Sequence, residues 1–88
     1  MELTMKNLEK CFRAAFDIRA RYVGVKIEME GFEEPEIIIN QYENINSKLE
    51  YYKNAYNEDL TLKAFNGIKI IGFTYADYYE DIENDLVF

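Results

Sequence analysis

The clearest pattern of apolar and polar positions lies in residues 35–57, where a short apolar run gives way to a helical period. Residues 37–39 are three isoleucines, a β-branched run typical of a strand that is buried on both sides. Apolar side chains then recur at helical spacing, within roughly 60° of one another at ~100° per residue. They are Ile45, Leu49, Tyr52 and Tyr56. The pattern predicts a strand followed by an amphipathic helix over residues 44–56.

Polar residues mark both ends of this predicted helix. Asn44 or Asn46 can serve as its N-cap, and Ser47 with Glu50 has the S-x-x-E spacing of a capping box. Asn57 is a suitable residue at which to end it.

A second amphipathic helix is predicted for residues 3–21. Its apolar positions share one side, which should pack on a sheet, and they are Leu8, Cys11, Phe12, Ala15, Ile18 and Tyr22. The opposite side forms a basic strip of Lys6, Lys10, Arg13 and Arg21.

Three stretches have strand patterns. Residues 22–29 alternate between apolar and polar side chains, as in a half-buried strand. Gly31 and Pro35 then indicate a turn, after which residues 36–40 should return antiparallel to the first strand. Residues 68–75 are apolar on both faces, which predicts a strand at the centre of the sheet.

Two segments leave alternatives open. Residues 58–67 are compatible with a strand in a hairpin turning at Asn66-Gly67, with a short helix, or with a loop anchored by Leu60 and Leu62. Residues 77–88 are either an acidic tail or a short helix that docks on the sheet. The docking side chains would be Tyr79, Ile82 and Leu86.

Together these elements predict an α+β fold, a small antiparallel sheet with two packed helices in the order α-β-β-α-β. An extra strand or short helix at residues 58–67 and a C-terminal helix are possible additions. With 88 residues, the chain is expected to form one domain over residues 1–88.

The composition excludes most catalytic chemistry. The chain has no histidine, which removes Ser-His-Asp and Cys-His arrangements and most zinc sites. Its four glycines are too scattered for a phosphate-binding loop. Cys11, the single cysteine, cannot form an internal disulfide and is placed on the buried side of a helix. The missing motifs lead us to expect a non-enzymatic protein without metal or cofactor. The chain shows no signal peptide or membrane-spanning run, so we expect it to be cytoplasmic.

Charge is distributed unevenly along the chain. Residues 1–26 carry six basic and three acidic side chains, whereas residues 27–88 carry four and fourteen. The total of −7 argues against direct binding of nucleic acid or an anionic membrane. Two acidic stretches also contain aromatic residues, and together they form the predicted partner-binding set. The set comprises Glu30, Phe32, Glu33, Glu34, Asp77, Tyr78, Tyr79, Glu80, Asp81 and Glu83.

Two stretches carry a resemblance to known proteins. GFEEPEIIIN (residues 31–40) and LEYYKNAYNEDLTLKAFNGIKIIGF (residues 49–73) resemble uncharacterised small proteins of phages and integrated elements of Gram-positive bacteria. In size and acidity the chain is also similar to anti-CRISPR proteins that block Cas9-type nucleases by filling a DNA-binding groove. The resemblance implies an inhibitor of a host nucleic-acid-binding protein, such as a CRISPR effector, that needs no cofactor. The alternative is a structural module that self-assembles, for example as a homodimer through a strand edge or its tyrosine-rich helix.

Overall fold

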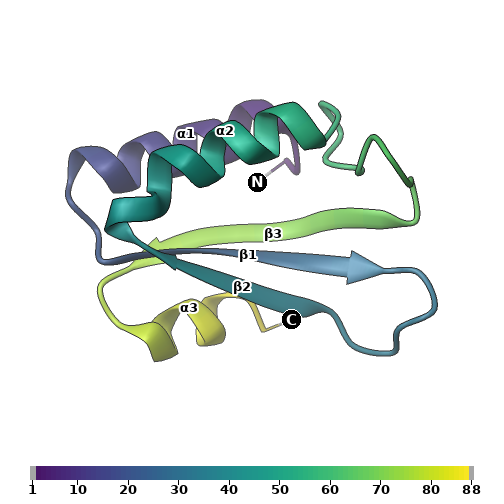
Figure 1. Ribbon diagram of the computed structural model, residues 1–88. Helices are drawn as coiled ribbons and strands as arrows, with labels where there is room; N and C mark the ends of the chain where they lie inside the picture. Colours follow the sequence, from purple (N-terminus) through teal and green to yellow (C-terminus); the bar gives the residue numbers. More distant parts are fainter. Residues whose placement is uncertain (1, 88) are drawn as a thin grey trace.

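The computed structural model describes residues 2–87 and consists of a three-stranded antiparallel sheet with helices on both faces (Figure 1). Its elements in chain order are α1 (Met5–Asp17), β1 (Tyr22–Met29), β2 (Glu36–Gln41), the 3-10 turn η1 (Tyr42–Asn44), α2 (Ile45–Ala55), β3 (Ile68–Ala76) and α3 (Tyr79–Asp85). The predicted α+β class and the order α-β-β-α-β are confirmed. Of the two alternatives for the C-terminal segment, the structure has the helix.

The sheet has the order β2-β1-β3, with β1 antiparallel to both neighbours. The predicted antiparallel return of the second strand is confirmed. The prediction of β3 as the central strand is wrong, because β3 forms an edge. Its apolar side chains face α1 on one side of the sheet and α3 on the other, so both of its faces are covered at an edge position. Residues 37–39 of β2 are only partly buried, which contradicts the expectation of a strand buried on both sides.

One face of the sheet is covered by α1 and α2, which lie side by side in Figure 1. Their apolar stripes pack against alternate residues of β1 and against β3 to form the main core. The buried residues of this core from the helices are Leu8, Phe12, Ala15, Ile45, Leu49 and Tyr52, and those from the strands are Val23, Val25, Ile27, Ile70 and Phe73. The predicted apolar faces of both helices are therefore largely correct.

The opposite face is covered by the short helix α3 (Figure 1). Ile82 and Leu86 pack over Gly24, and a Cβ atom at position 24 would overlap the Ile82 side chain. Lys26 lies under the same helix, where its ammonium donates a hydrogen bond of 2.7 Å to the Leu86 carbonyl. Although its alternation predicts a half-buried strand, β1 is thus covered on both faces.

Local hydrogen bonds end α1 earlier than the sequence pattern predicts. The hydroxyl of Thr4 accepts the Asn7 N–H at 3.2 Å and caps the helix start. At the other end Arg19 has φ +57°, and the N–H groups of Arg19 and Ala20 bond the carbonyls of the last helical turn. The chain turns there, which leaves Ile18 exposed rather than on the buried face.

The predicted stripe of α2 is buried, but its capping box is not formed. Asn44 is the N-cap residue and its side chain makes no capping bond. Ser47 lies inside the helix and donates its hydroxyl hydrogen to the Asn44 carbonyl at 3.2 Å. Tyr56 ends the helix and is itself buried.

The segment between α2 and β3 is an ordered loop, which agrees with the third alternative for residues 58–67. Leu60 is fully buried with φ +68°, and the loop bonds β3 through Ile70 N–H to the Leu60 carbonyl at 2.9 Å. One isolated antiparallel bridge, Thr61↔Lys69, retains part of the hairpin alternative without forming a strand. The carboxylate of Asp59 accepts bonds from Thr61, and these bonds lower its pKa.

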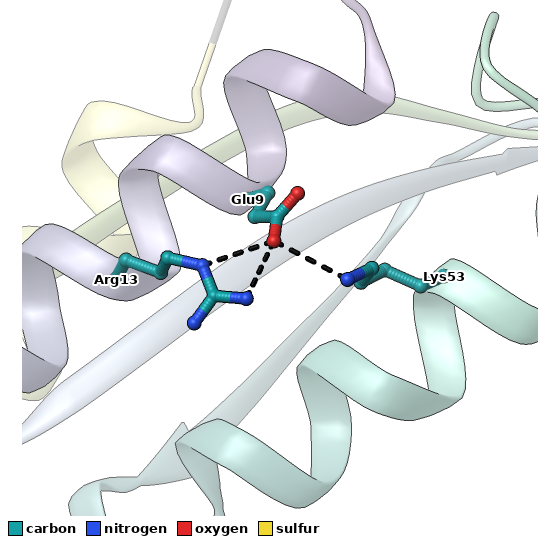
Figure 2. A network of polar contacts seen from close by, with 3 residues as sticks. All are labelled: Glu9, Arg13 and Lys53. Atoms are coloured by element: carbon teal, nitrogen blue, oxygen red, sulfur yellow. Dashed lines mark hydrogen bonds and ion pairs between the residues drawn. The ribbon is translucent and has the colours of Figure 1, made fainter.

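A charged network joins the two helices of the main core (Figure 2). One oxygen of Glu9 accepts bonds from Arg13 of the same helix at 2.9 and 2.6 Å and from Lys53 of α2 at 3.3 Å. The Arg13 hydrogen bonds, followed by the Lys53 bond, lower the pKa of Glu9. Glu9 is therefore a carboxylate whose charge is compensated within the fold.

Candidate protein-binding surface

The turn between β1 and β2 carries the densest group of carboxylates. Gly31 adopts φ +89° with open space around its Cα, and the Phe32 N–H closes the turn on the Met29 carbonyl at 3.1 Å. All residues from 30 to 36 are exposed. We call this surface the acidic tip, and define it as Glu28, Glu30, Phe32, Glu33, Glu34 and Glu36.

The carboxylates of the acidic tip form no ion pair within residues 2–87, although Lys69 of β3 lies opposite Glu28. Residues 27–36 include no lysine or arginine, and within residues 2–87 the ion pairs that form involve Glu9 and not the tip. Phe32 stands among them with 67% of its surface exposed. An exposed aromatic ring beside carboxylates that form no ion pair has the composition of a binding anchor.

The tip is held in place by the loop that precedes β3. The Glu30 N–H donates to the Gly67 carbonyl at 2.8 Å. A Cβ atom at position 67 would meet both the Glu30 carboxylate and the Phe65 ring, so these two side chains flank Gly67. Phe65, 49% exposed, thus adds a second aromatic ring that sequence reasoning missed. The Asn66-Gly67 turn beside it was the available signal.

The remaining predicted residues surround the start of α3. They are Asp77, Tyr78, Tyr79, Glu80, Asp81 and Glu83. All six are exposed, with Tyr78 and Tyr79 exposed at 62% and 56%. This group, the α3 cluster, has cationic and aromatic neighbours. Asp77 accepts the Arg21 N–H at 3.2 Å, and Asp77 and Tyr78 share a hollow of about 360 Å³ with Arg19 and Arg21.

The structure does not bring the acidic tip and the α3 cluster together. They follow opposite ends of the sheet, because Met29 pairs with Ile68 beside the tip and Tyr22 pairs with Ala76 beside the α3 cluster. The eight residues of β1 separate them by about 23 Å at roughly 3.3 Å per residue. Two further acidic residues, Glu58 and Asp59, lie at the tip end, where residues 60–62 adjoin the first residues of β3. The predicted set therefore forms two separate surfaces.

The described residues contain no metal-ligating cluster, and their one thiol is not activated. No group of three metal-ligating His, Cys, Asp or Glu side chains occurs within residues 2–87. Burial raises the pKa of the Cys11 thiol to about 11, which suppresses the reactive thiolate at neutral pH. The Tyr52 hydroxyl is buried without a hydrogen-bond partner among the described residues, and burial raises its pKa too. None of the helices in residues 2–87 is long and apolar enough to cross a membrane.

Comparison with known proteins adds no relative to this description: no protein-family model matches the chain, and neither a curated protein nor a solved structure matches it significantly. The resemblance to phage-encoded and anti-CRISPR proteins therefore stays a prediction. The surfaces must be interpreted from their own geometry and charge.

Proposed function

We propose that the protein is a non-enzymatic inhibitor of anti-CRISPR or anti-defence type, which binds a basic site on a host nucleic-acid-binding protein. The acidic tip is the surface that enters this site. The observation that carries the proposal is the exposed Phe32 ring beside carboxylates that form no ion pair within residues 2–87.

The chemistry of such a contact is that of phosphate replacement. A groove that binds nucleic acid holds lysine and arginine side chains at the spacing of a phosphate backbone. A row of carboxylates can bind these cations in place of the phosphates and displace their counterions. The five carboxylates of the tip lie on one turn and the strand residues adjoining it, with Glu36 on the sheet face of Ile27 and Glu28 on the opposite face. Phe32 would supply the apolar contact that resists salt, and the carboxylates would supply specificity and association rate.

The α3 cluster is less suited to this role. Asp77 lines a hollow with Arg19 and Arg21, and it already accepts a backbone hydrogen bond from Arg21. A carboxylate with internal partners gains less from an external cation than one without them. We therefore assign binding to the tip.

The experiment is affinity capture from a lysate of the native host, with wild type and two charge-reversed variants. Glu33→Lys with Glu34→Lys reverses two of the five charges of the tip. Glu80→Lys with Glu83→Lys reverses two charges of the α3 cluster. We expect wild type and the α3 variant to retain a nucleic-acid-binding protein that elutes as salt rises, and the tip variant to retain none. Circular dichroism checks that both variants fold. Equal capture by the tip variant and the wild type would exclude the tip as the binding surface.

A self-assembling module is the second candidate, and the outer edge of β2 favours it. β2 is an edge strand, and no described segment pairs with its outer side. The tyrosine-rich helix is a poorer interface, because Tyr52 and Tyr56 are buried in the core. Sedimentation in high salt separates the candidates, since a dimer joined through backbone bonds and isoleucines persists there, whereas a tip-mediated complex weakens.

A further inference from the structure

A groove of about 300 Å³ lies between α1 and the outer edge of β3. It is lined by Asn7, Lys10 and Cys11 of the helix and by Phe73, Thr74 and Tyr75 of the strand. The three helical residues lie at spacings of three and four, so they share the side of α1 that faces away from Glu9 and α2. The groove is on a different part of the molecule from both acidic surfaces.

The edge of β3 is paired at its start and open beyond it. Ile70 N–H bonds the Leu60 carbonyl at 2.9 Å, and Leu62 N–H bonds the Ile68 carbonyl at 2.8 Å. After Ile70 no described segment pairs with the outer side of β3. The open length coincides with the strand residues that line the groove.

The direction of the free backbone groups follows from the register. Successive residues of a strand direct their N–H and C=O groups to alternate edges, and Ile68 and Ile70 direct theirs outward. One extra residue lies between the pairs Ile27↔Ile70 and Lys26↔Gly72. This bulge reverses the alternation, so the N–H and C=O groups of Phe73 and Tyr75 point outward, into the groove.

Lys10 is the charged side chain among the residues that line the groove, and Lys6 lies one helical turn before it on the exposed surface of α1. Both lysines also line a neighbouring hollow that contains Glu2, Glu9 and Glu58. Neither lysine takes part in an ion pair within residues 2–87, whereas Arg13 is engaged by Glu9. Inside the groove, the partly buried Cys11 offers apolar surface, and Phe73 adds the accessible margin of an otherwise buried ring.

We propose that this groove binds an extended acidic segment of a partner protein, which adds to the sheet as a strand beside β3. Its backbone would bond the outward groups of Phe73 and Tyr75, and alternate side chains would enter the space under α1. Its carboxylates would lie near Lys6 and Lys10, and this charge complementarity selects an acidic occupant. The proposal does not depend on the function assigned to the acidic tip.

The test is a selection from a displayed library of linear random peptides of about seven residues, a usual strand length, on the full-length protein. We expect acidic, β-forming sequences to be enriched. A synthesised copy of the enriched peptide should bind Lys10→Glu roughly tenfold more weakly than wild type. Lys63→Glu is the matched control, because Lys63 is an exposed lysine of the loop before β3, and it should bind as wild type does.

Amide hydrogen exchange supplies the readout that locates the peptide. Binding should slow the exchange of the Phe73 and Tyr75 amides. The Glu33→Lys, Glu34→Lys variant should keep full peptide affinity, so a failure of the proposed tip function would not affect this result. Enrichment of neutral or basic peptides, no enrichment at all, or protection confined to β2 would overturn the proposal. A homodimer that Lys10→Glu dissociates would also overturn it, since the occupant would then be a second copy.

Discussion

The two ends of β1 carry similar residues in different surroundings. At the end of the strand, the acidic tip combines five carboxylates that form no ion pair within residues 2–87 with an exposed Phe32, and Lys69 of β3 lies opposite Glu28. At its start, the α3 cluster combines carboxylates and exposed tyrosines with Arg19, Arg21 and a backbone donor. The difference shows that acidity alone does not indicate a binding surface. The relevant property is whether the fold itself supplies the partners of the charges.

The largest expected difference between the acidic tip and the α3 cluster is in their contribution to the affinity for the captured host protein. Phe32→Ala should weaken the complex with the captured host protein by about 2 kcal/mol, roughly a 30-fold loss, as expected for an aromatic anchor in a desolvated contact. The melting temperature should not change, because the ring contributes little to the core. Tyr78→Ala removes a ring of similar exposure from the α3 cluster and is the matched control. Titration calorimetry measures both, and equal losses would mean that the two ends bind together.

A second variant disturbs the packing of α3 on the sheet and leaves the acidic tip unchanged. Gly24→Ala places a methyl group against Ile82 and should destabilise the protein by about 1.5 kcal/mol through overpacking. Urea denaturation measures the loss. Affinity for the host protein should stay at the wild-type value, and a parallel fall in affinity would assign a role to the α3 cluster. Combining the change with Ile82→Ala gives the control, because removing the opposing side chain should make the double variant more stable than the sum of the single effects.

The smallest expected effect is on the pH dependence of stability, where Glu9, which forms ion pairs, is compared with a carboxylate of the tip. The pKa of Glu9 is lowered by Arg13 and Lys53, so the folded state holds its proton less tightly than the unfolded state. Its contribution to stability is therefore present above the unfolded pKa and is lost as the pH falls through the folded pKa. Between about pH 5 and 3, near the usual pKa range of glutamate, wild type should lose more stability than Glu9→Gln. Thermal unfolding at several pH values measures this, and Glu33→Gln is the control that removes a tip carboxylate.

The sequence predicts the individual helices and strands better than it predicts how they are arranged in the sheet. Alternation located β1 at its observed bounds, and the stripe of α2 is buried as expected, because both depend on spacing within one element. The strand order was predicted wrongly because an apolar run indicates burial on both faces without indicating what covers them. The two faces of β3 are covered by the helices α1 and α3, which can pack on a strand at the edge of the sheet as well as on one at its centre.

The candidate surfaces show the same division. The tip residues follow from one turn, so their proximity could be predicted from the sequence. The separation of the α3 cluster from the tip depends on β3 ending beside the start of β1, which no local pattern encodes. The groove beside β3 was also out of reach, since it depends on the bulge opposite Lys26 and on the side of α1 that faces the open edge.

Competition between nucleic acid and this protein for the captured host protein tests the central claim most directly. If the acidic tip occupies a phosphate-binding site, the host protein should bind its nucleic acid or this protein, but not both. The Glu33→Lys, Glu34→Lys variant should fail to displace the nucleic acid, and the Glu80→Lys, Glu83→Lys variant should displace it as wild type does. A stable ternary complex of host protein, nucleic acid and wild-type protein would contradict the account.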